Sequence, residues 1–117
     1  MQHAHIDRAI DYVEFTTPDL GTIKDFYGKV FDWKFQDWGD DYVSFNDGRV
    51  DGGFARGEAK TGSGPLVILY SSDLEAIQQK VRAASGKITK DTFSFPGGRR
   101  FHFADPAGNE LAVWSDK

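Results

Sequence analysis

The chain has 117 residues, a formal net charge of −4 and a hydrophobic content of 39%, which fits one compact domain. The acidic balance excludes a protein that binds nucleic acid through a clustered positive surface. No apolar run is long enough to span a membrane. The absence of cysteine excludes disulfides, thiolate nucleophiles and cysteine-ligated metals. With no apolar signal-peptide core at the N-terminus, we expect a cytoplasmic location.

Aromatic side chains are abundant for this length: ten Phe, four Tyr and three Trp. Aromatic rings bury large areas, and they serve equally well as core or as the lining of a ligand cavity. Both interpretations stay open at this point.

The first half begins with a polar segment, Met1–Arg8, expected to be a loose lead-in. His3 and His5 lie in it, and a flexible pair of histidines has no fixed geometry for a metal. A strand is predicted over Ala9–Thr16. Thr17 or Asp19 is then expected to cap a helix.

The predicted first helix has apolar residues at spacings of three and four, which indicates one buried face. That face consists of Leu20, Ile23, Phe26, Tyr27, Val30 and Phe31. Three strands are predicted after it, over Trp33–Trp38, Asp41–Asn46 and Val50–Arg56. The first module, about residues 8–57, therefore reads strand, helix, strand, strand, strand.

A small, polar linker at Glu58–Gly64 precedes a second pattern of the same kind. A strand is predicted at Pro65–Ser71, followed by a helix capped by Ser72 or Asp73. The helix has an inner face of Leu74, Ile77, Val81 and Ala84, and Ser85-Gly86 is expected to end it as a glycine C-cap. Strands follow at Lys87–Asp91, Gly98–Ala104 and Asn109–Trp114. The second module, about residues 65–117, thus repeats the first, which indicates an internal duplication within a single domain.

Several motifs occur in the order and spacing of a known superfamily. They are Ile10–Phe15, Pro18-Asp19-Leu20, Phe26–Trp33, Val50–Phe54 and the turn Asp105-Pro106-Ala107-Gly108 before Asn109. Over almost the whole chain, this arrangement resembles the vicinal-oxygen-chelate superfamily, which includes glyoxalase I, bleomycin-resistance proteins and extradiol dioxygenases. Asp32 departs from the pattern, since the family usually has Gly there.

The resemblance implies an α+β fold of two βαβββ modules forming a curled mixed sheet around a pocket. It also implies a homodimer, because the family commonly dimerises. In metal-dependent members a Glu ligand stands seven residues after the turn Asp, where this chain has Ala112. The other ligand positions fall at Tyr12, near Gly53 or Phe54, and near Leu66 or Val67. A divalent metal needs several N or O donors held together, so we expect no metal and no cofactor.

Strand alternation and the resemblance together predict a pocket wall. A five-residue loop, Asp105–Asn109, pairs His102 with Ala112 and Arg100 with Trp114, and residues two apart share a face. The predicted ligand-binding residues are Tyr12, Glu14, Arg100, His102, Glu110 and Trp114. A one-residue slip in register turns these strand residues outward. Each also has a structural alternative: a surface ion pair, a satisfied histidine, a solvated carboxylate or plain aromatic packing.

These residues favour two functions from different classes. The first is metal-independent binding of a small organic molecule, with rings for stacking and Arg100 for an anionic group. The alternative is a lactoylglutathione-lyase-like isomerase or lyase. In that case Glu14 or His102 is the catalytic proton carrier, or an atypical metal uses Glu14, His102 and Glu110. A third interpretation, a structural subunit with a vestigial pocket, stays open.

Overall fold

The computed structural model describes residues 4–58, 64–106 and 108–117. The expected α+β fold with two βαβββ modules is confirmed. The elements are β1 (Ile10–Thr17), α1 (Leu20–Phe31), β2 (Lys34–Asp37), β3 (Tyr42–Asn46), β4 (Asp51–Arg56), β5 (Leu66–Tyr70), α2 (Leu74–Ala83), β6 (Lys87–Phe95), β7 (Gly98–Ala104) and β8 (Glu110–Ser115). Neither described helix has the length and apolar character needed to cross a membrane.

The chain divides into two compact units. The first contains Tyr12–Pro65, and the second combines Leu66–Lys117 with the early segment His5–Asp11. The expected linker, Glu58–Gly64, lies mostly outside the described residues. Contacts therefore assign the early segment to the second half of the chain.

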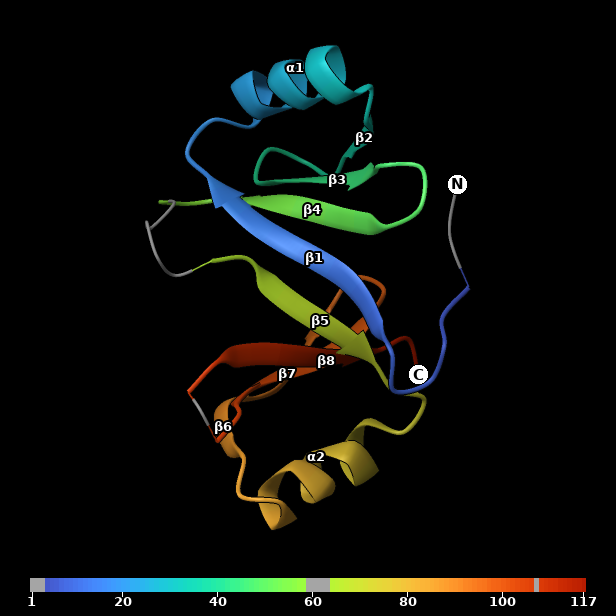
Figure 1. Ribbon diagram of the computed structural model, residues 1–117, viewed down its shortest axis with the longest axis vertical. Helices are drawn as coiled ribbons and strands as arrows, with labels where there is room; N and C mark the ends of the chain where they lie inside the picture. The colour runs from blue at the N-terminus through green and yellow to red at the C-terminus, as the bar shows by residue number, and fades with distance from the viewer. Residues whose placement is uncertain (1–3, 59–63, 107) are drawn as a thin grey trace. The chain divides into compact units, whose positions relative to one another are not determined.

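Both units use the same strand connections (Figure 1). The strand order is β2-β3-β4-β1 in the first unit and β5-β8-β7-β6 in the second. The first strand of each module pairs in parallel with the last, β1 with β4 and β5 with β8. The remaining pairs are antiparallel. This repeat is the duplication that the sequence pattern indicated.

One face of each sheet packs on a helix. In the first unit, Leu20 of α1 packs with Val43 and Phe54 of the sheet. In the second, Leu74 of α2 packs with Phe101 and Val113. Because side chains alternate along a strand, the neighbours of these core residues lie on the opposite, open face of each sheet.

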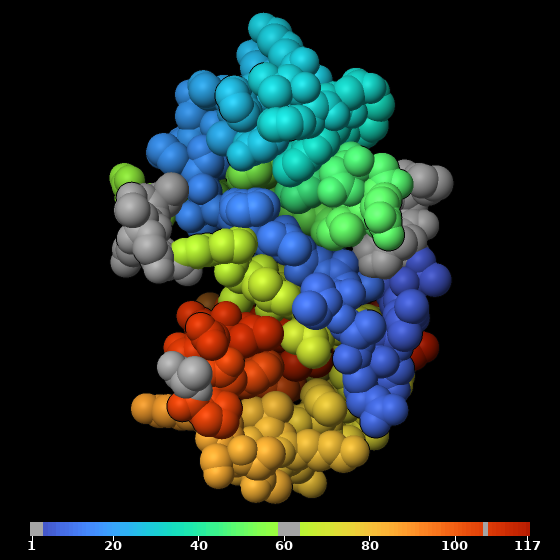
Figure 2. All heavy atoms as spheres, viewed as in Figure 1, coloured from blue at the N-terminus to red at the C-terminus, as the bar shows by residue number. Residues whose placement is uncertain are grey.

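The sequence predicts a wider buried face for α1 than the structure has. Phe26, Val30 and Phe31 are 51%, 56% and 58% exposed, whereas Leu20 is buried and Ile23 and Tyr27 pack beside it. A stripe of three residues is enough to cover this sheet, so the other apolar residues lie on the solvent side. Figure 2 shows α1, in light blue to cyan, at the surface of the first unit.

The helix ends settle the alternatives for the caps. Asp19 and Asp73 are the N-caps, and their side chains accept from the backbone N–H of Thr22 and Ala76. Asp32 ends α1 with a left-handed φ of 59°. This conformation explains why the family usually has Gly at this position.

The glycine C-cap predicted for α2 is wrong in detail. Ser85, rather than Gly86, has the left-handed conformation, with φ 72°. Gly86 donates to the carbonyl of Val81 at 2.8 Å and Ser85 to that of Arg82 at 3.3 Å, the paired bonds of a Schellman motif. A Cβ on Gly86 would lie 2.6 Å from a methyl group of Val81. Position 86 therefore needs glycine because the backbone passes close to Val81, and not because of its φ.

Candidate functional site

The predicted pairing of the last hairpin is confirmed. His102 pairs with Ala112, and Arg100 pairs with Trp114. Since Phe101 and Val113 pack on the α2 side, these four residues lie on the open face of the second sheet. The turn closes as expected, because Asp105 accepts from the backbone N–H of both Gly108 and Asn109.

A carboxylate and an imidazole meet on this face. Nδ1 of His102 lies 3.3 Å from Oε2 of Glu110, and the hydroxyl of Thr89 donates to the same oxygen at 3.2 Å. His102 is only 8% exposed. Burial lowers its pKa, the nearby Arg100 and Lys90 lower it further, and Glu110 opposes them. At neutral pH the ring is therefore uncharged.

This arrangement determines what the other ring nitrogen of His102 offers. A carboxylate beside Nδ1 favours the tautomer that has its proton there. Nε2 is then an acceptor, and it is buried without a hydrogen-bond partner among the described residues. A buried, unsatisfied acceptor is uncommon and costs free energy. Nε2 is thus a natural partner for a ligand O–H or N–H.

Two phenylalanines that the sequence analysis missed complete this face. The guanidinium of Arg100 lies 5.4 Å from the ring centre of Phe93 and 6.0 Å from that of Phe95, and Nζ of Lys90 lies 4.6 Å from Phe93. The ring of Phe93 also lies 5.9 Å from that of His102. The ring of Phe93 therefore adjoins the imidazole, while Phe95 lies beside Arg100 on the same face.

These rings were missed because the sequence predicts that the sixth strand ends before them. Strand β6 continues to Phe95 instead of ending at Asp91. Its pairing with β7 shifts between Ile88 and Lys90 and again before Phe93. The polar run of Lys90–Thr92 resembles a strand end, and the irregular pairing disturbs the period of two on which strand prediction depends.

Trp114 makes several contacts within the second unit. Its indole N–H donates to Asp11 at 2.9 Å, and its ring lies 5.4 Å from Tyr70 and 6.3 Å from Phe95. His5 stacks on Tyr70 and meets Trp114 edge-on. The expectation of a loose lead-in is therefore wrong for His5, while His3 lies outside the described residues.

In the first unit, Tyr12 and Glu14 are joined through Tyr42. The hydroxyls of Tyr12 and Tyr42 are 2.7 Å apart, and Tyr42 donates to Glu14 at 3.0 Å. Burial, with the neighbouring Glu14, raises the pKa of Tyr42 above its ordinary value. A Cβ on Gly53 would lie 2.1 Å from the Tyr42 hydroxyl oxygen and 2.5 Å from that of Tyr12, so only glycine leaves room for this contact.

The six predicted residues therefore divide between the units. Arg100, His102, Glu110 and Trp114 share the open face of the second sheet, and His102 is in contact with Glu110. Tyr12 and Glu14 belong to the first unit, where their partner is Tyr42. A proton-transfer pair of Glu14 and His102 stays a prediction.

The residues at the family's metal positions do not fit a divalent ion. Tyr12 offers one phenol, while Gly53 and Ala112 have no donor in their side chains. Among the described residues, no three His, Asp or Glu side chains gather where they would hold a metal.

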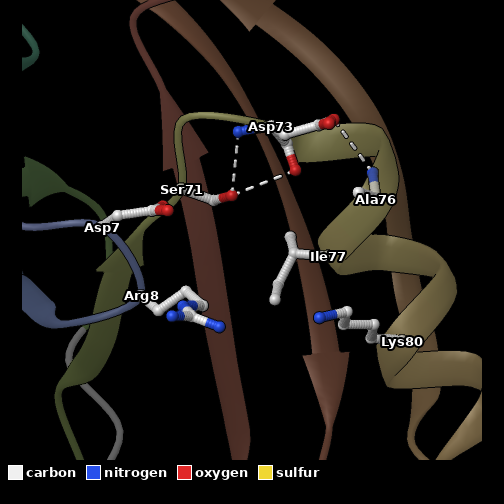
Figure 3. Close-up of a pocket in the computed structure, with 7 residues that line it drawn as sticks. All are labelled: Asp7, Arg8, Ser71, Asp73, Ala76, Ile77 and Lys80. Carbon is white, nitrogen blue, oxygen red and sulfur yellow. Dashed lines mark hydrogen bonds between the residues drawn. The ribbon is translucent and has the colours of Figure 1, made fainter.

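A separate groove of about 140 Å³ lies beside α2 (Figure 3). It is lined by Asp7, Arg8, Ser71, Asp73, Ala76, Ile77 and Lys80. Both acids are engaged by backbone N–H groups, Asp7 by Ser72 and Asp73 by Ala76. The groove contains none of the predicted ligand-binding residues, so we place the candidate site on the open face and not here.

Comparison with known proteins gives the family. Residues 9–113 match the Glyoxalase/Bleomycin resistance protein/Dioxygenase superfamily, and the chain belongs to it. A relative in Streptomyces peucetius, "Anthracycline biosynthesis protein DnrV", is 28% identical over 124 residues, which cover 88% of this chain and 45% of the relative. The chain thus spans less than half the length of that relative.

Solved structures share the fold. A superfamily member from Vibrio splendidus 12B01 has a TM-score of 0.70 at 18% identity, covering 89% of this chain and 96% of the other. A methylmalonyl-CoA epimerase from Mycobacterium tuberculosis has a TM-score of 0.71 at 12% identity, covering 98% and 92%. At these identities the likeness concerns the fold alone.

Proposed function

We propose that this protein binds a small, planar organic molecule with an acidic group, without a metal, on the open face of its second sheet. The observation that carries this proposal is the guanidinium of Arg100 beside Phe93 and Phe95, on the same face as the partnerless Nε2 of His102. These groups offer stacking, positive charge and a hydrogen-bond acceptor within a few side chains.

The chemistry of each group defines the ligand class. Phe93 and Phe95 stack on a flat ring. Arg100 pairs with a carboxylate through two parallel N–H bonds, which a single ammonium cannot provide. Nε2 of the neutral His102 accepts a hydrogen bond from a ligand hydroxyl. A hydroxylated aromatic acid satisfies all three.

The relative in Streptomyces peucetius supports a polycyclic ligand, since its name concerns anthracycline biosynthesis. This chain matches only 45% of that protein. Anthracycline-like ring systems are therefore the first ligands to test. The expected homodimer, which light scattering during size-exclusion chromatography tests, belongs to the same proposal.

A matched pair of probes tests the proposal. Anthraquinone-2-carboxylate is titrated into the protein by calorimetry, and its neutral carboxamide is titrated in parallel. We expect the carboxylate to bind at least about tenfold more tightly, because a hydrogen bond to a charged group contributes about 1.5–3 kcal/mol. Arg100→Gln is expected to remove most of this difference.

Arg49→Gln is the matched control, because Arg49 is an exposed cation in the first unit. It should leave both affinities unchanged. Equal binding of the two probes to the unaltered protein would contradict a role for Arg100, and binding of neither would contradict an aromatic site.

A second function, isomerisation or lyase chemistry, is favoured by the contact of Glu110 with His102. A carboxylate that orients a neutral imidazole is a common arrangement for general base catalysis. Under this alternative Nε2 takes a proton from carbon beside a carbonyl and returns it, with no net change in protonation.

Exchange of carbon-bound hydrogen for deuterium in D₂O, followed by NMR on candidate keto acids, detects that step. Exchange that is lost in His102→Asn but retained after chelation supports the alternative. Exchange that requires added Mn²⁺, Ni²⁺, Zn²⁺ or Fe²⁺, with near one equivalent of metal by elemental analysis, indicates an atypical metal site instead.

A further inference from the structure

His5 packs against two aromatic rings of the second unit. Its ring stacks on that of Tyr70, with centres 5.0 Å apart and planes at 17°. It meets the Trp114 indole edge-on at 5.1 Å and 89°. The ring centres of Tyr70 and Trp114 are 5.4 Å apart, and their planes are inclined at 72°. We call these two rings, together with Asp11, the Tyr70–Trp114 cage.

The cage has a polar side that selects for an N–H group. Nδ1 of His5 lies 3.2 Å from one carboxylate oxygen of Asp11 and 3.1 Å from the other. Asp11 is 4% exposed, and Trp114 donates to it at 2.9 Å, which fixes its orientation. A buried carboxylate is stabilised by donors, and a ring with an N–H in the place of His5 would donate to the same carboxylate.

We propose that the Tyr70–Trp114 cage binds a small, planar N–H heteroaromatic compound, such as an azole, a pyrrole or an indole, and that His5 fills it as an internal substitute. The cage shares Trp114 with the open face of the second sheet but contains neither Arg100 nor His102, and the proposal does not depend on the proposed function. The His5 side chain is 31% exposed, so solvent reaches the ring that a ligand would displace.

The backbone anchors of the early segment lie after His5, at Asp7 and Arg8. Asp7 accepts from the backbone N–H of Ser72 at 2.9 Å, and Arg8 donates to the carbonyl of Tyr70 at 2.7 Å. Figure 3 shows Asp7 and Arg8 beside Ser71 at this anchor. Ile6, between His5 and the anchor, is 66% exposed. Displacing His5 therefore breaks none of the anchoring bonds.

Vacating the cage tests the proposal directly, because a recess left by a truncated side chain takes up small molecules of matching shape and polarity. Pyrazole, which is neutral and has one N–H, is titrated against ¹⁵N-labelled His5→Gly while the indole signal of Trp114 is followed. That signal is assigned with Trp114→Phe. We expect saturable shifts, with affinity at least tenfold higher than in the unaltered protein, where His5 competes.

1-Methylpyrazole has the same shape without the N–H, so we expect it to bind at least fivefold more weakly than pyrazole. Ile6→Gly is the matched control: it loosens the same segment but leaves His5 in place, and should behave as the unaltered protein does. His5→Ala repeats the test if His5→Gly does not fold.

Three results would overturn the proposal. The first is no pyrazole shift in a folded His5 variant, which shows that the cage is not a site. The second is equal pyrazole affinity with and without His5, which shows that His5 does not occupy it. The third is equal binding of both pyrazoles, which shows that Asp11 does not select for N–H.

Discussion

The indole N–H of Trp114 donates to the buried carboxylate of Asp11 at 2.9 Å, joining two residues 103 positions apart. Asp11→Ala leaves this donor without its partner, so we expect the free energy of unfolding to fall by about 1–3 kcal/mol. Urea denaturation measures the change. Asp25→Ala removes an exposed carboxylate of α1 and should stay within about 0.5 kcal/mol. A similar loss in both variants would show that the bond to Trp114 contributes little.

His102 is expected to make stability depend on pH. Burial, Arg100 and Lys90 lower its pKa in the folded state, so the unfolded chain binds the proton more readily. Stability therefore falls as pH decreases from the ordinary histidine value of 6.5 toward the lower folded pKa, and is level above that range. NMR titration gives the pKa, and denaturation at several pH values gives the slope.

His102→Gln should reduce that slope. Glu110→Gln removes the negative charge that raises the pKa of His102, so this pKa should fall further. A pKa of His102 that rises in Glu110→Gln would contradict the contact between these residues.

Gly53 is expected to be essential for the contact between Tyr12 and Tyr42. In Gly53→Ala the new methyl carbon lies 2.1 Å from the Tyr42 hydroxyl oxygen, and we expect a loss of about 1–3 kcal/mol in the free energy of unfolding. Tyr42→Phe removes the atom in closest conflict, so the double variant should lose less than the sum of the single losses.

Gly28→Ala is the control, since nothing lies within 4 Å of its added Cβ. It should be stabilising by up to about 1 kcal/mol, because alanine favours helix.

Asp32→Gly is expected to stabilise the protein. Asp32 has φ 59° at the end of α1, a conformation that glycine adopts without a Cβ conflict. The gain should be about 0.5–1 kcal/mol, reduced slightly by losing the exposed ion pair with Lys34. The midpoint of thermal unfolding reports it. Asp32→Ala should be destabilising, and a gain in that variant would show that backbone conformation is not the cause.

Much of the fold was predictable because its signals are local. The helices begin where a capping Asp precedes an apolar period, as at Asp19 and Asp73. The register of the last hairpin followed from the length of its turn, which set Arg100 opposite Trp114. Periodicity gives the direction of an apolar face but not its width, and for this reason Phe26 was placed in the core although it is exposed.

The rest of the site depends on contacts between distant residues. Tyr42 has no periodic signal of its own, and it reaches Glu14 only because β3 and β1 both pair with β4. His5 looks like part of a polar tail until Tyr70 and Trp114 are placed beside it. Neither contact follows from spacing along the chain.

The second unit unites residues that a ribosome makes at very different times. Its early segment, His5–Asp11, is assigned to a unit whose other residues begin at Leu66, and β5 finds its parallel partner only in β8, which ends at Ser115. During synthesis Asp11 emerges about a hundred residues before Trp114, its hydrogen-bond donor. Native pairing in this unit therefore cannot be complete until β8 has been made, and the nascent chain has to keep its early strand from pairing elsewhere in the meantime.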